Sequence, residues 1–178
     1  LYRLRGALRR GGDDSTKFVL AERGRYRLDV ARFDVDADRF ETLASQAREA
    51  SGPRQAALLQ KAVDLVRGDV LADVDYGWVD AERRRFRDSA SDALYRLGEL
   101  RLALGAHEEA LDVARRYVDW DVLDERAHLL GMRAYGALGD AAGVEKAYRA
   151  LTRVLRDELD VEPALETERL YRVLSGRA

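Results

Sequence analysis

Arginine is the residue type whose number and spacing most clearly indicate chemistry in the first part of the chain. Residues 1–32 contain nine basic and four acidic residues, a net charge of +5, whereas the whole chain of 178 residues carries −2. Residues 33–178 therefore carry −7. Guanidinium groups neutralise phosphates and can enter a narrow minor groove, so this basic segment indicates a polyanion partner at one end only. The candidate DNA-binding residues are Arg3, Arg5, Arg9, Arg10, Arg23 and Arg25.

The same arginines also fit a simpler role, because exposed arginines commonly do no more than solvate a helix surface. In a helix that reads DNA, the N-terminal residues contact most of the base edges. Residues 1–10 are expected to form the later part of a helix, so such residues would precede Leu1. The arginines that follow would position a DNA backbone without reading its sequence. We therefore expect these 178 residues alone to bind DNA weakly or not at all, and the intact protein to bind it with a steep salt dependence.

Other motifs that could carry chemistry are incomplete. The chain has no cysteine, which excludes disulfides, thiol nucleophiles and zinc–thiolate sites. Residues 34–38 begin like a calcium loop, but Arg39 replaces the required glycine and Ser45 the bidentate glutamate. His107 and Glu108 do not begin a zinc motif, because Leu111 stands where its second histidine would be. The sequence thus predicts no enzyme activity, no metal and no cofactor.

A cluster of acidic residues surrounds Trp78. A hard-metal site is one interpretation, but an acidic, solvated loop that caps the following helix is simpler. We expect Trp78 to anchor in the core beneath that loop. The acidic residues are Asp73, Asp75, Asp80 and Glu82.

Two kinds of periodicity divide the chain near residue 33. Leucines at i, i+3 and i+7 predict a helix over the first ten residues, and the run 11–14 ends it. Short strands follow at 18–20 and 26–28, and Gly24 permits the positive φ that a hairpin turn often needs. From Phe33 onward the pattern is helical. The expected helices contain Phe40–Ala47, Pro53–Arg67 and a long stripe Phe86–Leu104, followed by helices near 107–120, 124–138, 140–158 and 165–175.

The helical part contains an internal repeat. Ala103-Leu104-Gly105 recurs 34 residues later as Ala137-Leu138-Gly139. This interval is the tetratricopeptide (TPR) period, and the glycine falls where the two helices of a repeat turn. The predicted fold is mainly α: a TPR-like superhelix of antiparallel helix pairs, preceded by one helix and a β-hairpin.

Such superhelices present the inner faces of their first (A) helices to partner proteins. Repeat position alone makes Tyr95, Glu99, Arg126 and Arg133 the candidate partner-binding residues. The alternative is that these side chains are merely solvated.

Two stretches of sequence resemble parts of known regulators. Leu4-Arg5 through Leu8, with Arg23 through Leu28, looks like the last part of an OmpR-like winged helix, although Arg25 intervenes between Gly24 and Tyr26. The helical part resembles the bacterial transcriptional activation domain, although Asp160 replaces a usual glycine and Ala164 a usual serine or threonine. The residues that carry this second resemblance are 36–43, 67–73, Trp78 and 158–163.

The resemblance implies a regulator of the Streptomyces antibiotic regulatory protein type. Residues 1–32 would then be the end of a winged helix that binds promoter DNA, and 33–178 an effector domain. That domain would form a homodimer or contact RNA polymerase. The protein would act in the cytoplasm and would have no membrane partner. The alternative function is a TPR-like protein–protein interaction scaffold without a direct promoter role.

Overall fold

The computed structural model describes residues 18–22 and 24–176. The predicted first helix lies outside these residues, as do five of the candidate DNA-binding arginines: Arg3, Arg5, Arg9, Arg10 and Arg23. The chain forms two compact units, Leu1–Asp38 and Arg39–Ala178. We call them the N-terminal unit and the helical unit.

A β-hairpin is the main element described in the N-terminal unit. Its two strands are antiparallel, with Val19 opposite Leu28, and Gly24 in the turn has a φ of +78°. The rings of Phe18 and Phe33 meet edge to face, with centroids 5.8 Å apart. The predicted hairpin is therefore confirmed. The elements are β1 (Val19–Glu22), β2 (Arg25–Leu28) and a 3-10 turn, η3 (Val30–Arg32).

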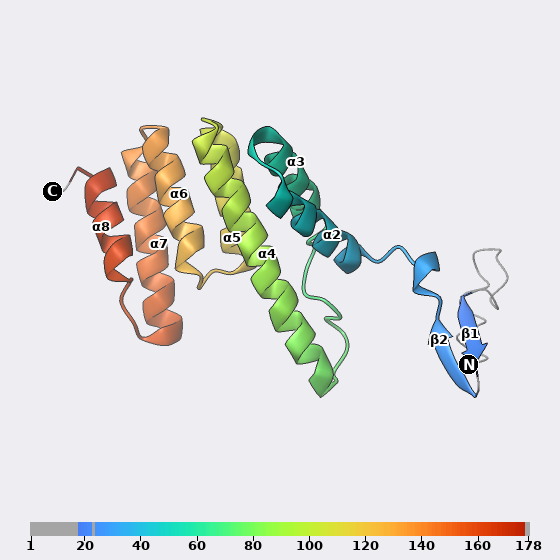
Figure 1. Cartoon of the computed structure of the whole chain (residues 1–178). Helices are drawn as coiled ribbons and strands as arrows, with labels where there is room; N and C mark the ends of the chain where they lie inside the picture. The colour runs from blue at the N-terminus through green and yellow to red at the C-terminus, as the bar shows by residue number, and fades with distance from the viewer. Residues whose placement is uncertain (1–17, 23, 177–178) are drawn as a thin grey trace. The chain divides into compact units, whose positions relative to one another are not determined.

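The helical unit is a series of antiparallel helices in which each helix from α4 to α8 runs beside its neighbours (Figure 1). The predicted TPR-like helical architecture is thus confirmed. In the described part of the chain, no helix is both long and apolar enough to cross a membrane. The helices are α2 (Asp36–Glu49), α3 (Gly52–Val63), α4 (Gly77–Ala103), α5 (His107–Trp120), α6 (Glu125–Ala137), α7 (Ala141–Leu159) and α8 (Leu165–Leu174).

The two repeated glycines end α4 and α6 in the same way. Gly105 and Gly139 have φ values of +74° and +73°. The N–H of Ala106 donates to the Arg101 carbonyl at 2.9 Å, and the N–H of Asp140 donates to the Tyr135 carbonyl at 2.9 Å. Each bond closes a left-handed C-terminal cap for which glycine is the favoured residue. The 34-residue repeat of the sequence is therefore a repeat of backbone geometry.

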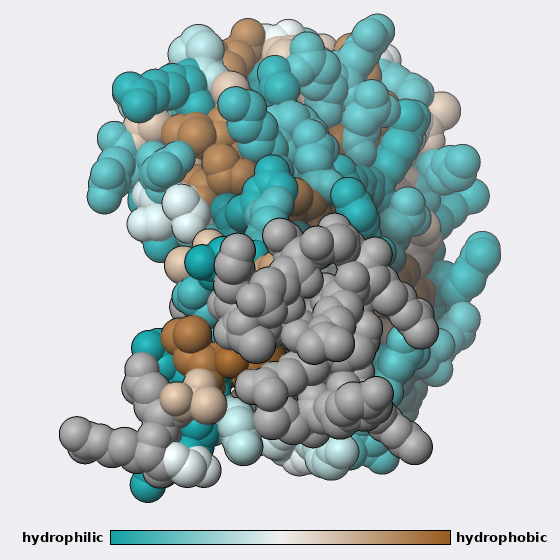
Figure 2. Space-filling view, turned by 90° about the vertical axis from the view of Figure 1, so that its right-hand side faces the viewer, coloured by the Kyte–Doolittle hydropathy of each residue, from teal (hydrophilic) through white to brown (hydrophobic). Residues whose placement is uncertain are grey.

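A core of apolar side chains runs through the helix pairs. Leu97, Tyr117 and Leu130 are fully buried and join α4, α5 and α6. Phe40 of α2 is also buried, and its ring lies 5.0 Å from that of Phe86. Among the residues that are coloured in Figure 2, hydrophilic side chains cover most of the surface, and apolar ones show in patches between them.

The predicted helix Pro53–Arg67 ends earlier than expected, at Val63 rather than near Gly68. The chain continues in tight turns, with the N–H of Val66 donating to the Val63 carbonyl at 2.9 Å. Arg116 of α5 then donates to the carbonyls of Val63 and Val66 at 2.6 and 3.0 Å. A side chain from another helix thus satisfies the carbonyls that a continuing helix would have used.

The expectation that Trp78 is a core anchor is wrong. Trp78 is 63% exposed at the start of α4, next to Tyr76, which is 65% exposed. Arg83 holds the preceding loop instead, because its guanidinium donates to the carbonyls of Val70 and Val74 at 3.2 and 2.7 Å. The Arg83 side chain therefore anchors the loop by binding backbone carbonyls of the loop, and Trp78 lies at the surface.

Candidate functional site

The four predicted partner-binding residues form two contacts between α4 and α6. The guanidinium of Arg126 lies 5.6 Å from the centre of the Tyr95 ring, a cation–π contact. Arg133 forms an ion pair with Glu99. All four side chains are partly exposed. We call Tyr95, Glu99, Arg126 and Arg133, together with Asp92, the inner-face network.

Asp92 is the member of this network that the sequence pattern did not single out. Its carboxylate accepts a hydrogen bond from Arg126 at 2.9 Å. Arg126 lies 34 residues after Asp92, and Arg133 lies 34 residues after Glu99. Opposite charges separated by one repeat are the signal in the sequence that could have identified both pairs.

Asp124 fixes the start of α6 and the position of Arg126. Its carboxylate accepts from the Arg126 backbone N–H at 3.0 Å and from the Arg126 guanidinium at 2.8 Å. The hydroxyl of Tyr117, a fully buried residue, donates to the same carboxylate at 2.5 Å. The N-cap of one helix and a core tyrosine therefore orient an arginine of the inner face.

The charges of this cluster are mutually stabilised. Partial burial alone would raise the pKa of Asp124, but the hydrogen bonds from Arg126 and Tyr117 outweigh burial and lower it. The hydrogen bond to Asp124 raises the pKa of Arg126, and burial together with the Asp124 carboxylate raises that of Tyr117. At neutral pH the cluster thus consists of a carboxylate, a guanidinium and a neutral phenol.

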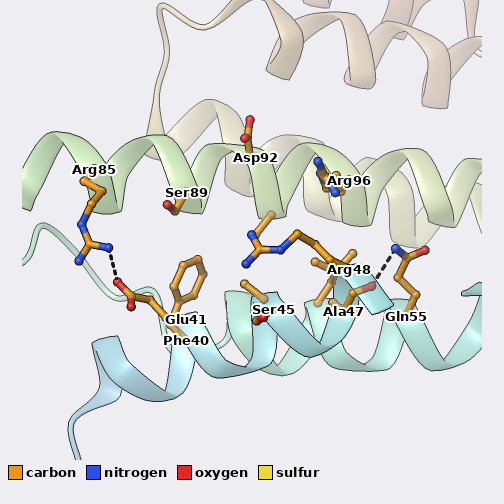
Figure 3. A pocket seen from close by; sticks show the side chains of 13 residues that line it. Phe40, Glu41, Ser45, Ala47, Arg48, Gln55, Arg85, Ser89, Asp92 and Arg96 are labelled. Carbon is orange, nitrogen blue, oxygen red and sulfur yellow. Dashed lines mark hydrogen bonds and ion pairs between the residues drawn. The ribbon is translucent and has the colours of Figure 1, made fainter. Parts of the chain in front are cut away.

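A pocket of about 440 Å³ lies beside the inner-face network, between α2, α3 and α4 (Figure 3). Asp92 belongs to both, because it lines the pocket and pairs with Arg126. Apolar periodicity gives no sign of this pocket, since its shape depends on how three successive helices pack against one another. Its lining residues include Phe40, Glu41, Arg48, Leu59, Arg85 and Arg96.

Glu125 ties the last helix to α6. Its carboxylate accepts from the backbone N–H of Ala164 at 3.1 Å and from the Thr167 hydroxyl at 2.6 Å. Ala164 is the N-cap of α8 and has no side-chain cap of its own. A carboxylate from a neighbouring helix thus binds the backbone N–H of the N-cap residue, as the glutamate of a capping box does within one helix.

Of the six candidate DNA-binding arginines, the described residues include only Arg25. It lies on β2, where it is exposed and paired in register with Glu22 of β1. Within residues 18–22 and 24–176, no three His, Cys, Asp or Glu side chains are grouped so that they could hold a metal ion. The DNA-contacting role of the arginines remains a prediction.

Comparison with protein families identifies the family of the helical unit. The profile of the bacterial transcriptional activator domain matches residues 35–174, which span α2 to α8. The chain belongs to this family. The membership confirms the resemblance drawn from residues 36–43 and 158–163.

Characterised relatives are regulatory proteins of Streptomyces. The chain is 29% identical over 156 residues to the regulatory protein DnrI of Streptomyces peucetius, covering 85% of this chain and 57% of DnrI. It is 30% identical over 150 residues to the regulatory protein AfsR of Streptomyces coelicolor, covering 82% of this chain and 15% of AfsR. The chain thus spans a little over half of one relative and a small part of the other.

A solved structure supports the fold. Mycobacterium tuberculosis EmbR, determined in complex with a low-affinity phosphopeptide, superposes with a TM-score of 0.73 at 20% identity. The match covers 99% of this chain and 48% of the EmbR chain. At this identity the likeness concerns the fold alone.

Proposed function

We propose that this chain is the effector part of a promoter-bound transcription regulator, in which the helical domain contacts a partner protein. The observation that carries the proposal is the family match over residues 35–174. The regulatory names of DnrI and AfsR support it. Residues 33–178 would form the effector domain and residues 1–32 the end of a winged-helix DNA-binding domain.

The inner-face network supports a protein partner for the helical domain. Its side chains are charged or aromatic and at least partly exposed, and ion pairs hold both of its arginines in place. Held arginines and tyrosines are typical of binding hot spots, because little side-chain entropy is lost on binding. The partner we propose is RNA polymerase, and a second copy in a homodimer is the alternative use of the same face.

The DNA partner is promoter DNA, bound through the complete winged helix. Arg3, Arg5, Arg9, Arg10, Arg23 and Arg25 would contribute phosphate contacts, which set affinity and its salt dependence. The regulator would act in the cytoplasm, without a metal, a cofactor or a catalysed reaction.

The proposal is tested in cells by deleting residues 33–178 from the protein and measuring transcripts and promoter occupancy. We expect transcripts of occupied promoters to change when the helical domain is removed. A second arm uses the full-length protein as bait and probes for RNA polymerase subunits. Unchanged transcripts together with no captured polymerase subunit would contradict the proposal and favour a scaffold without a promoter role.

A substitution separates loss of the partner surface from loss of the domain. Arg133→Glu reverses a charge of the inner-face network, whereas Arg54→Glu reverses an exposed charge on α3, outside that network. The proposal predicts reduced polymerase capture for the first variant and native capture for the second.

A further inference from the structure

The pocket between α2, α3 and α4 contains two arginines without an ion pair among the described residues. Arg48 lies on α2 and Arg96 on α4, so the two guanidinium groups come from opposite walls (Figure 3). Both side chains are exposed. The guanidinium group of arginine presents a planar set of donors that suits carboxylates. Two arginines that lack ion-pair partners and share one hollow are therefore a site for negatively charged groups.

The other charges on the rim are already compensated. Arg85 pairs with Glu41 across the pocket at 2.8 Å and with Glu82 at 2.9 Å. Asp92 pairs with Arg126 at 2.9 Å. The positive charge available to a ligand therefore comes from Arg48 and Arg96.

The floor of the same pocket is apolar. Phe40, Ala47, Leu59 and Ala93 line it and are each less than 5% exposed. Beside this floor Gln55 donates to the Ala47 carbonyl at 3.0 Å and so joins α3 to the end of α2. A hollow with an apolar floor and a charged rim fits a ligand that has both kinds of group.

We propose that this pocket binds an acidic segment of a partner protein, whose carboxylates pair with Arg48 and Arg96 while an apolar side chain enters the floor. The inference rests on the proposed function and names the chemistry of the partner. Asp92 joins the pocket to the inner-face network, so a bound segment continues toward Tyr95 and Arg126. Carboxylates next to apolar side chains are complementary to this surface.

Charge distinguishes a protein segment from a nucleic acid as the occupant. A nucleic acid needs a continuous basic surface, since its phosphates are evenly spaced. Here Glu41 and Asp92 stand on the rim beside the arginines, and residues 33–178 carry a net charge of −7. Two isolated cations in an acidic domain suit a few carboxylates and disfavour a polyanion.

The test is a titration of the full 178-residue chain, labelled with 15N, followed by two-dimensional NMR. The probe is a synthetic helical peptide that alternates pairs of glutamate and leucine. A matched peptide has glutamine at each glutamate, and an oligothymidylate serves as the nucleic-acid probe. We expect the acidic peptide to shift signals of Ala44–Arg48 and Ser89–Arg96, and the glutamine peptide to bind more weakly.

Arginine variants locate the site. Arg48→Gln and Arg96→Gln should each weaken binding of the acidic peptide about two- to fivefold, the range for a partly exposed ion pair. Arg54→Gln removes an exposed charge of α3 outside the pocket and should leave the affinity unchanged. Undisturbed signals elsewhere show that each variant is folded.

Several results would overturn the inference. These are no shifts at the pocket with saturating peptide, equal binding of the glutamine peptide, or tighter binding of the oligothymidylate at the same residues. Each leaves the proposed function intact, because that function is judged by transcripts and polymerase capture. Conversely, peptide binding with unchanged transcripts would support the pocket and contradict the regulator.

Discussion

Arg126 on α6 and Asp92 on α4 are ion-paired at 2.9 Å although 34 residues separate them along the chain. Arg133 and Glu99 are paired over the same interval. Since 34 residues is the length of one repeat, each pair joins equivalent positions on successive A helices. The stacking of the repeats therefore places complementary charges side by side on one face of the superhelix.

The Arg126–Asp92 pair should contribute little to stability. The two side chains are 43% and 60% exposed, so a double-mutant cycle with Arg126→Gln and Asp92→Asn should give a coupling of about 0.5 kcal/mol. Urea unfolding of the four proteins measures it. The exposed pair Arg115–Asp112 on α5 is the control and should give a smaller coupling. A coupling of about 2 kcal/mol or more would show that the pair holds the fold together instead of serving recognition.

Gly98 should be intolerant of a side chain because α4 and α6 approach closely there. A Cβ at Gly98 would lie 2.2 Å from Cδ2 of Leu130, a fully buried residue. Gly98→Ala should therefore cost about 2 kcal/mol through overpacking, as measured by chemical denaturation. Gly131→Ala is the matched control, because its Cβ would meet only the Ala114 Cβ at 3.8 Å; it should be neutral or stabilising by up to about 1 kcal/mol. Equal effects of the two substitutions would refute the close approach.

Glu125 should control the attachment of α8. Glu125→Ala removes the acceptor of the Ala164 N–H and of the hydroxyl of Thr167, which is 1% exposed. We expect a loss of about 1–3 kcal/mol, the cost of an unsatisfied buried group, and faster amide hydrogen exchange in α8 than in α4. Glu166→Ala changes an exposed residue in the first turn of α8 and should leave exchange nearly unchanged. Native exchange in the Glu125 variant would show that α8 is held in another way.

Asp124 should make the chain less stable in acid. Its folded pKa lies below its ordinary value, which is about 3.9 in an unfolded chain. As the pH falls below about 3.9, Asp124 binds a proton more readily in the unfolded chain than in the folded one. The stability that the Asp124 carboxylate contributes is therefore lost as the pH falls through its folded pKa. Asp124→Asn keeps a capping oxygen but removes the titration. The free energy of unfolding from pH 7 to pH 3 should therefore fall less in the variant than in the native chain, and parallel curves would contradict this role.

Local signals in the sequence were enough to predict most of the fold. Helix ends at Gly105 and Gly139 follow from turn chemistry, and the helices follow from their apolar periodicity. The predictions were wrong where contacts with residues distant in the chain determine the local structure. Arg116 of α5 binds the Val63 carbonyl at the end of α3, and Arg83, not Trp78, anchors the loop before α4.

The candidate site was predictable only in part, for the same reason. Tyr95, Glu99, Arg126 and Arg133 follow from repeat position, and the structure brings them together in pairs. The pocket between α2, α3 and α4 depends instead on the angles at which these successive helices pack, which apolar periodicity does not encode.

The most direct test of the regulator is the level of transcripts at the promoters that the protein occupies, compared between native cells and cells carrying Arg126→Glu with Arg133→Glu. Immunoblots establish equal abundance, and chromatin immunoprecipitation measures occupancy. If the inner-face network contacts the transcription machinery, occupancy stays native while these transcripts fall. Native transcript levels at native occupancy and abundance would contradict the account.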